Sequence, residues 1–173
     1  MRTTKYKILK YATYALVAIF LCVLQNTPGL FAISGVKPML VMSFAVCVTL
    51  FEKETAGGLF GAFAGMLCDL FGSYTFGFYT LLLFVGCVLV GLLTQSFMRP
   101  VLFNAVLFTL ALGCFIQLVG FAFTMLLRSV PDAWQYYGRC LLPMCAYTAV
   151  TAAVFFYPAS ILYHYFEAKV LAA

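Results

Sequence analysis

The chain has 173 residues, of which 65% are hydrophobic and only 9% are charged. A soluble domain is about 45–50% apolar and about 25% charged, and a small domain still exposes much of its surface. The excess of apolar residues therefore excludes an ordinary water-soluble fold and makes a lipid bilayer the expected solvent. The net charge of +5 does not indicate nucleic-acid binding, because the basic residues lie at segment ends, where they orient helices in a membrane.

Long apolar runs, such as residues 78–93 and 101–127, predict helices. In lipid every backbone polar group has to be paired, which leaves helices or a closed β-barrel, and barrel strands would alternate apolar and polar residues. We therefore expect an all-α polytopic membrane helix bundle forming one integral membrane domain over residues 1–173. About six transmembrane spans are predicted, at about 11–30, 38–51, 55–71, 76–95, 101–127 and 139–163. The second and third fall short of the about 20 residues that a spanning helix needs.

The distribution of basic residues predicts the orientation of the chain. The basic N-terminal stretch resembles the start of a signal peptide, but the apolar run continues to Leu24 without a cleavage motif, so we expect a retained first helix. The positive-inside rule then places both termini in the cytoplasm. The cytoplasmic side would hold Arg2, Lys5, Lys7, Lys10, Lys53, Arg99 and Lys169, and the outer side Lys37, Arg128 and Arg139. Glu52 and Glu54, which flank Lys53, are interpreted as part of a solvated loop.

The third predicted span carries a regular pattern of small residues. Gly57, Gly61, Gly65 and Asp69 recur at intervals of four, so they lie along one face of a helix. Such faces let two helices approach closely in lipid, where the hydrophobic effect no longer drives their association. We favour internal packing of this helix as the role of the face. The alternative is a docking face for the helix of a partner protein, and the two roles do not exclude each other.

Asp69 is the only acidic residue inside an apolar span. A carboxylate in hydrocarbon is costly without a partner, and the C-terminal end of a helix disfavours negative charge. We favour a structural clamp over a proton or substrate site or simple solvation at the interface. The candidate charge partners of Asp69 are Lys37, Arg128 and Arg139, and the turn at 72–75 is a further source of hydrogen bonds.

Nothing in the sequence has the pattern of an active site. There is no Ser/His/Asp set, no phosphate-binding loop and no pair of carboxylates in an apolar span. The seven cysteines show no CxxC spacing, and there is a single histidine, whereas a zinc site needs about four clustered ligands. We therefore predict neither an enzyme, nor a metal site, nor a cofactor.

The motif that runs through residues 37–95 resembles the rod shape-determining protein MreD family. It consists of Lys37-Pro38 at the start of a span, the glycine-rich run 57–73 that contains Gly65 and Asp69, and Phe76-Gly77 before the next helix. In that family a basic-Pro pair opens a span, and a glycine-rich helix ends in G-x-x-x-D. A glycine-containing turn follows, with a second glycine before the next helix. Gly65, Asp69, Gly72 and Gly77 match this pattern.

The resemblance implies a non-enzymatic role in the bacterial cytoplasmic membrane. Proteins similar to MreD pair with MreC and act with RodA, a penicillin-binding transpeptidase and MreB filaments in peptidoglycan synthesis of the lateral wall, which sets cell shape. The fold would be similar to the S components of energy-coupling-factor vitamin transporters. The resemblance implies no catalytic residues, because the family has no established ones. The alternative function is therefore a vitamin-type transporter S component, which would share this fold.

Overall fold

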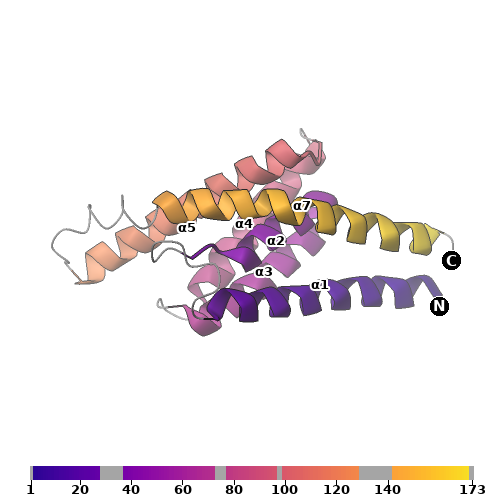
Figure 1. Ribbon diagram of the computed structural model, residues 1–173, viewed down its shortest axis with the longest axis horizontal. Helices are drawn as coiled ribbons and strands as arrows, with labels where there is room; N and C mark the ends of the chain where they lie inside the picture. Colours follow the sequence, from indigo (N-terminus) through magenta and orange to yellow (C-terminus); the bar gives the residue numbers. More distant parts are fainter. Residues whose placement is uncertain (1, 28–36, 73–76, 97–98, 129–141, 172–173) are drawn as a thin grey trace.

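The computed structural model describes residues 2–27, 37–72, 77–96, 99–128 and 142–171. These residues form helices and contain no strand, so the predicted all-α class is confirmed for this part of the chain. Both termini lie at the same end of the elongated bundle (Figure 1), which is called the terminal end below. The helices are α1 (Arg2–Asn26), α2 (Leu40–Phe51), α3 (Glu54–Phe71), α4 (Phe78–Ser96), α5 (Leu102–Arg128) and α7 (Leu142–Leu171).

Within the described residues four helices are long and apolar enough to cross a membrane, which is fewer than the six spans predicted. They contain the segments Lys5–Asn26, Phe78–Ser96, Leu102–Phe123 and Pro143–Val170. The two predicted spans that were short correspond to α2 and α3. With 12 residues, α2 extends only ~18 Å at ~1.5 Å per residue, against a hydrocarbon thickness of ~30 Å. Predicted boundaries also differ, since α1 includes the basic stretch and α7 continues beyond residue 163.

The outer faces of the long helices carry large apolar side chains. Leu16 and Phe20 of α1, Phe103 of α5 and Ile161 of α7 are each at least 60% exposed. Water-soluble monomers rarely expose extensive apolar surface of this kind. Lipid chains would solvate these side chains without cost, so the distribution fits a helical membrane protein.

Helix α2 is the buried centre of the bundle. Every residue from Leu40 to Leu50 is buried, and α1, α3, α4, α5 and α7 all pack against the helix. A buried helix start leaves backbone N–H groups that need partners. Thr148 of α7 accepts a hydrogen bond from the backbone N–H of Met39 at 3.1 Å, and Gln25 of α1 accepts one from Val41 at 3.2 Å. Side chains of neighbouring helices therefore replace the water that would otherwise cap α2.

The most extensive contact between helices joins α3 to α4. At Gly65 an added Cβ atom would lie 2.5 Å from the Cα atom of Thr80, and at Gly61 it would lie 2.8 Å from the carbonyl oxygen of Leu83. From the other side, a Cβ atom at Gly91 of α4 would lie 2.8 Å from the Cα atom of Glu54. The two backbones are in direct contact, and only glycine permits this approach.

Gly65→Ala should therefore destabilise the protein, although alanine is intrinsically the better helix former by about 1 kcal/mol. Overpacking typically costs about 1–3 kcal/mol, and the clash here is with backbone, which cannot rotate away. Thermal unfolding in detergent, followed by circular dichroism, would measure the loss. Gly113→Ala is the matched control, because its Cβ atom would meet only side-chain ends at ordinary contact distance, Met42 at 3.4 Å and Cys145 at 3.9 Å. Equal stabilities of the two variants would contradict the close approach.

Candidate functional site

The Asp69 carboxylate binds the start of α4. Its Oδ1 atom accepts a hydrogen bond from the backbone N–H of Tyr79 at 2.9 Å. Its Oδ2 atom accepts from the N–H groups of Gly77 and Thr80 at 3.1 and 3.0 Å. The hydroxyl of Thr80 donates a further bond to Oδ2 at 2.6 Å. Asp69 is thus the N-terminal cap of a helix other than its own.

This arrangement explains how a carboxylate that is only 7% exposed can be accommodated. The first N–H groups of a helix have no partners within that helix, and the helix dipole places partial positive charge there. A carboxylate at this position gains hydrogen bonds that are charge-assisted and stronger than neutral ones. Gly77 has a φ of +96°, a left-handed conformation that glycine adopts without strain and that lets the chain turn into α4 beneath the carboxylate.

Asp69 is held by the backbone of α4 and not by the cation predicted from the sequence that the structure describes, Lys37. Among the described residues no cation lies within ion-pair distance of Asp69, so Lys37 does not act as its partner. The side chains of Arg128 and Arg139 lie outside the described part of the structure. The backbone of α4 takes the place of a cation, because aligned N–H groups supply positive potential without a charged side chain. Gly72 closes α3 by donating its N–H to the backbone carbonyl of Asp69 at 3.3 Å.

The glycine face of α3 is covered by the protein itself. Gly57 contacts Thr49 of α2, while Gly61 and Gly65 contact α4. All three glycines and Asp69 are buried. The face therefore packs internally, as one of the two alternatives stated, and it offers no free surface for the helix of a partner.

A second polar cluster, which the sequence did not predict, lies at the terminal end. Lys10 of α1 is 7% exposed and forms an ion pair with Glu52, which follows α2. The Lys10 Nζ atom lies 3.9 Å from a carboxylate oxygen of Glu167 in α7 and 4.2 Å from the ring centroid of Tyr163. One ammonium group thus connects three helices that are far apart in sequence.

The interpretation of Glu52 as part of a solvated loop is wrong. Its side chain is only 8% exposed, because the short connection between α2 and α3 is folded against α1 and α7. Glu54 is the first residue of α3 and lies against Gly91 of α4. Of the three residues Glu52, Lys53 and Glu54, only Lys53 is exposed, as expected for a solvated loop.

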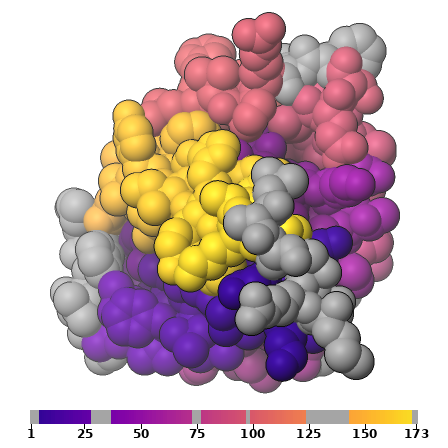
Figure 2. Space-filling model, turned by 90° about the vertical axis from the view of Figure 1, so that its right-hand side faces the viewer, coloured from indigo at the N-terminus to yellow at the C-terminus, as the bar shows by residue number. Residues whose placement is uncertain are grey.

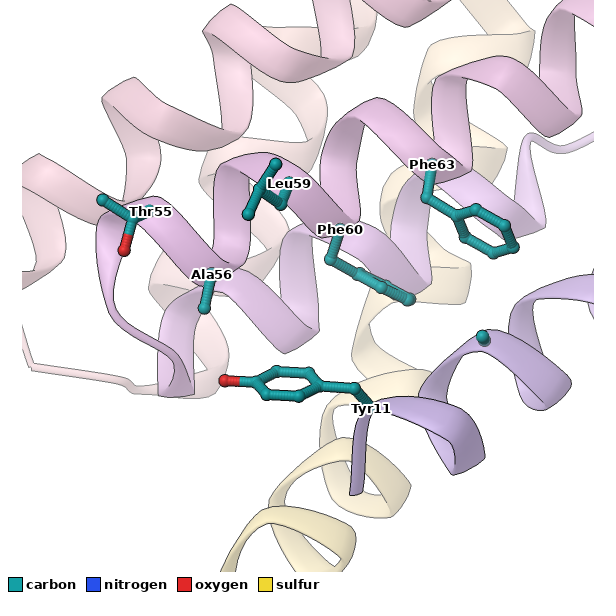
Figure 3. A pocket seen from close by; sticks show the side chains of 7 residues that line it. Tyr11, Thr55, Ala56, Leu59, Phe60 and Phe63 are labelled. Carbon is teal, nitrogen blue, oxygen red and sulfur yellow. The ribbon is translucent and has the colours of Figure 1, made fainter. Parts of the chain in front are cut away.

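Two adjoining hollows lie beside this cluster. One is an apolar groove of about 390 Å³ between α1 and α3, lined by Tyr11, Ala15, Thr55, Ala56, Leu59, Phe60 and Phe63 (Figure 3). The other is a pocket of about 420 Å³ at the terminal end, where Lys7, Lys10, Glu52, Lys53 and Glu167 contribute charged groups. Figure 2 looks onto this end, where the last turns of α7 lie beside the start of α1. Tyr11, Thr55 and Ala56 line both hollows.

Comparison of the chain with protein-family models, with curated proteins and with solved structures finds no match. Among the described residues no group of three or more His, Cys, Asp or Glu side chains is placed to hold a metal ion. The chemistry of the site must therefore be inferred from its own geometry. In that geometry the Asp69 carboxylate and the Lys10 ammonium each hold helices together.

Asp69→Asn should destabilise the protein by about 1–3 kcal/mol, because the amide nitrogen cannot accept hydrogen bonds and leaves buried N–H groups of α4 unpaired. Thr80→Val removes only one donor and should cost less, about 1 kcal/mol. Thermal unfolding of both variants in the same detergent would measure the difference. A loss for Thr80→Val as large as that for Asp69→Asn would contradict the capping role of the carboxylate.

Lys10→Met should be more damaging than the simultaneous loss of both charges. Removing one partner of a buried ion pair leaves an uncompensated charge and costs about 3–5 kcal/mol. The double variant Lys10→Met/Glu52→Gln should recover part of that loss, and a double-mutant cycle on unfolding midpoints measures the coupling. Lys5→Met is the control, since Lys5 is exposed on the same helix. Additive effects of the two substitutions would rule out the pair.

Proposed function

We propose that this protein is a non-enzymatic membrane scaffold of the bacterial machinery for cell-wall elongation, of the MreD type, and that it binds MreC. The observation that carries the proposal is structural. The motif residues behind the resemblance, Gly65, Asp69 and Gly77, are the ones that lock α3 and α4 into one hairpin. A motif used for internal rigidity suits a scaffold, whose task is to present a fixed surface.

The partner's helix would dock on the outer surface of this hairpin. The glycine face is buried against α2 and α4, but α3 also exposes Leu59, Met66 and Leu70, which are 69%, 50% and 59% exposed. Their spacing of seven and four residues places them along one stripe of the helix. In lipid such a stripe can pack against a single-span helix by van der Waals contact. A rigid hairpin behind it would lower the entropy lost on binding.

The same proposal includes the topology of the chain. All six helices would cross the membrane, with α2 and α3 shielded in part by the longer helices, and both termini would lie in the cytoplasm. The gathering of Lys5, Lys7, Lys53 and Lys169 on the segments of the terminal end supports this orientation. The fold would then be similar to that of the vitamin-transporter S components.

Deleting the gene in a rod-shaped host should give rounded cells, and the wild-type gene should restore rods. Met66→Trp/Leu70→Trp should lose MreC in co-purification and fail to restore cell shape, because bulky side chains would block the docking stripe. Leu107→Trp/Leu110→Trp is the matched control, since both residues are exposed on α5. Ratios of cell length to width and the yield of MreC are the readouts.

Normal rods after deletion would contradict the scaffold. A vitamin retained in stoichiometric amount on native mass spectrometry would instead favour the transporter S component. Unfolding midpoints would show whether the tryptophan variants fold. If they do not, alanine substitutions at Met66 and Leu70 would replace the tryptophan substitutions.

A further inference from the structure

We propose that the groove between α1 and α3, together with the adjoining pocket at the terminal end, binds one anionic phospholipid. One acyl chain would lie in the groove, and the headgroup phosphate would lie between Lys7 and Lys53. This inference depends on the membrane setting of the bundle and not on the scaffold role.

The apolar part of the site suits an acyl chain. Phe60 and Phe63 of α3 extend toward α1, and Leu59 lies beside them on the same helix (Figure 3). The groove has about 390 Å³, which lies within the range of ligand-binding clefts. Most of its lining is apolar, and the polar side chains of Tyr11 and Thr55 also line the charged pocket, where the headgroup would lie.

The charged part of the site suits a phosphate. The pocket is lined by three basic residues, Lys7, Lys10 and Lys53, and by two acidic ones, Glu52 and Glu167. Lys10 forms ion pairs with both carboxylates, whereas within the described residues no carboxylate lies within ion-pair distance of Lys7 or Lys53. Both of these lysines are exposed. The lining of the pocket thus carries positive charge that no ion pair among the described residues compensates.

The start of α3 adds to this complementarity. Lys53 is the N-cap residue of α3 and forms no side-chain capping hydrogen bond, and the first N–H groups of a helix have no partner within it. Thr55 supplies a hydroxyl at the same place. These groups favour an anion in the pocket but do not by themselves define its identity; the groove beside them indicates a lipid.

Tyr11 connects the two parts. Its ring lines both hollows, and its hydroxyl points toward the start of α3 at Ala56 (Figure 3). Tyrosine favours the boundary between apolar chains and polar headgroups, because its ring is apolar and its hydroxyl is polar. Its position marks the depth at which the acyl chain would give way to the headgroup.

Native mass spectrometry of the purified full-length protein tests this proposal, with phosphatidylglycerol and phosphatidylcholine of identical chains added in equal amounts. The wild type should retain one phosphatidylglycerol in preference to phosphatidylcholine. Lys7→Gln/Lys53→Gln should lower that preference about tenfold or more, since each lysine near an anionic lipid contributes about a fivefold factor. Ala15→Phe, which fills the groove, should reduce retention of both lipids.

Two matched controls separate a site from general attraction. Lys5→Gln/Lys169→Gln removes the same charge from exposed positions that line neither hollow, and Ala111→Phe adds the same ring to an exposed position of α5. Both should retain lipid as the wild type does. Equal retention of the two lipids by the wild type would overturn the proposal. An equal loss in the two lysine pairs, or competition by inorganic phosphate alone, would overturn it as well.

Discussion

The contact between the backbones of α3 and α4, fastened by one carboxylate, is the interaction on which the rest of the bundle depends. Glycine removes the side chains that would keep the helices apart, and Asp69 then reaches the N–H groups at the start of α4. Each feature needs the other. Without the close approach the carboxylate would lie unpaired in an apolar setting, and without the carboxylate the start of α4 would have buried donors and no acceptor.

The buried position of α2 shows the same physical requirement in another form. Helix α2 has only 12 residues and is enclosed by the other helices, so its first N–H groups must find acceptors among the side chains around it. Thr148 and Gln25 supply them from α7 and α1. At the opposite end of α2, Glu52 is paired with Lys10. The short helix is therefore held at both ends by polar groups of the helices that enclose it.

The structural roles of these polar groups bear on function. The Asp69 carboxylate and the Lys10 ammonium are both buried charged groups, and both hold helices together. The described surface includes exposed apolar side chains along α3 and a basic, hollowed region near the termini. Binding through these surfaces is the common basis of the proposed scaffold role and of the proposed lipid site.

Local composition and a period of four residues were enough to predict a lipid environment, the helical class and the importance of the Gly57–Asp69 pattern. The sequence also required a partner for Asp69, since an isolated carboxylate in hydrocarbon is too costly. It did not identify that partner, because the pairing of Asp69 with the start of α4 depends on how a tight turn folds back. The ion pair between Lys10 and Glu52 joins residues 42 positions apart in the numbering, and no local pattern links them. Only the tertiary structure brought these charges together, because helix packing decides which distant side chains share one water-poor space.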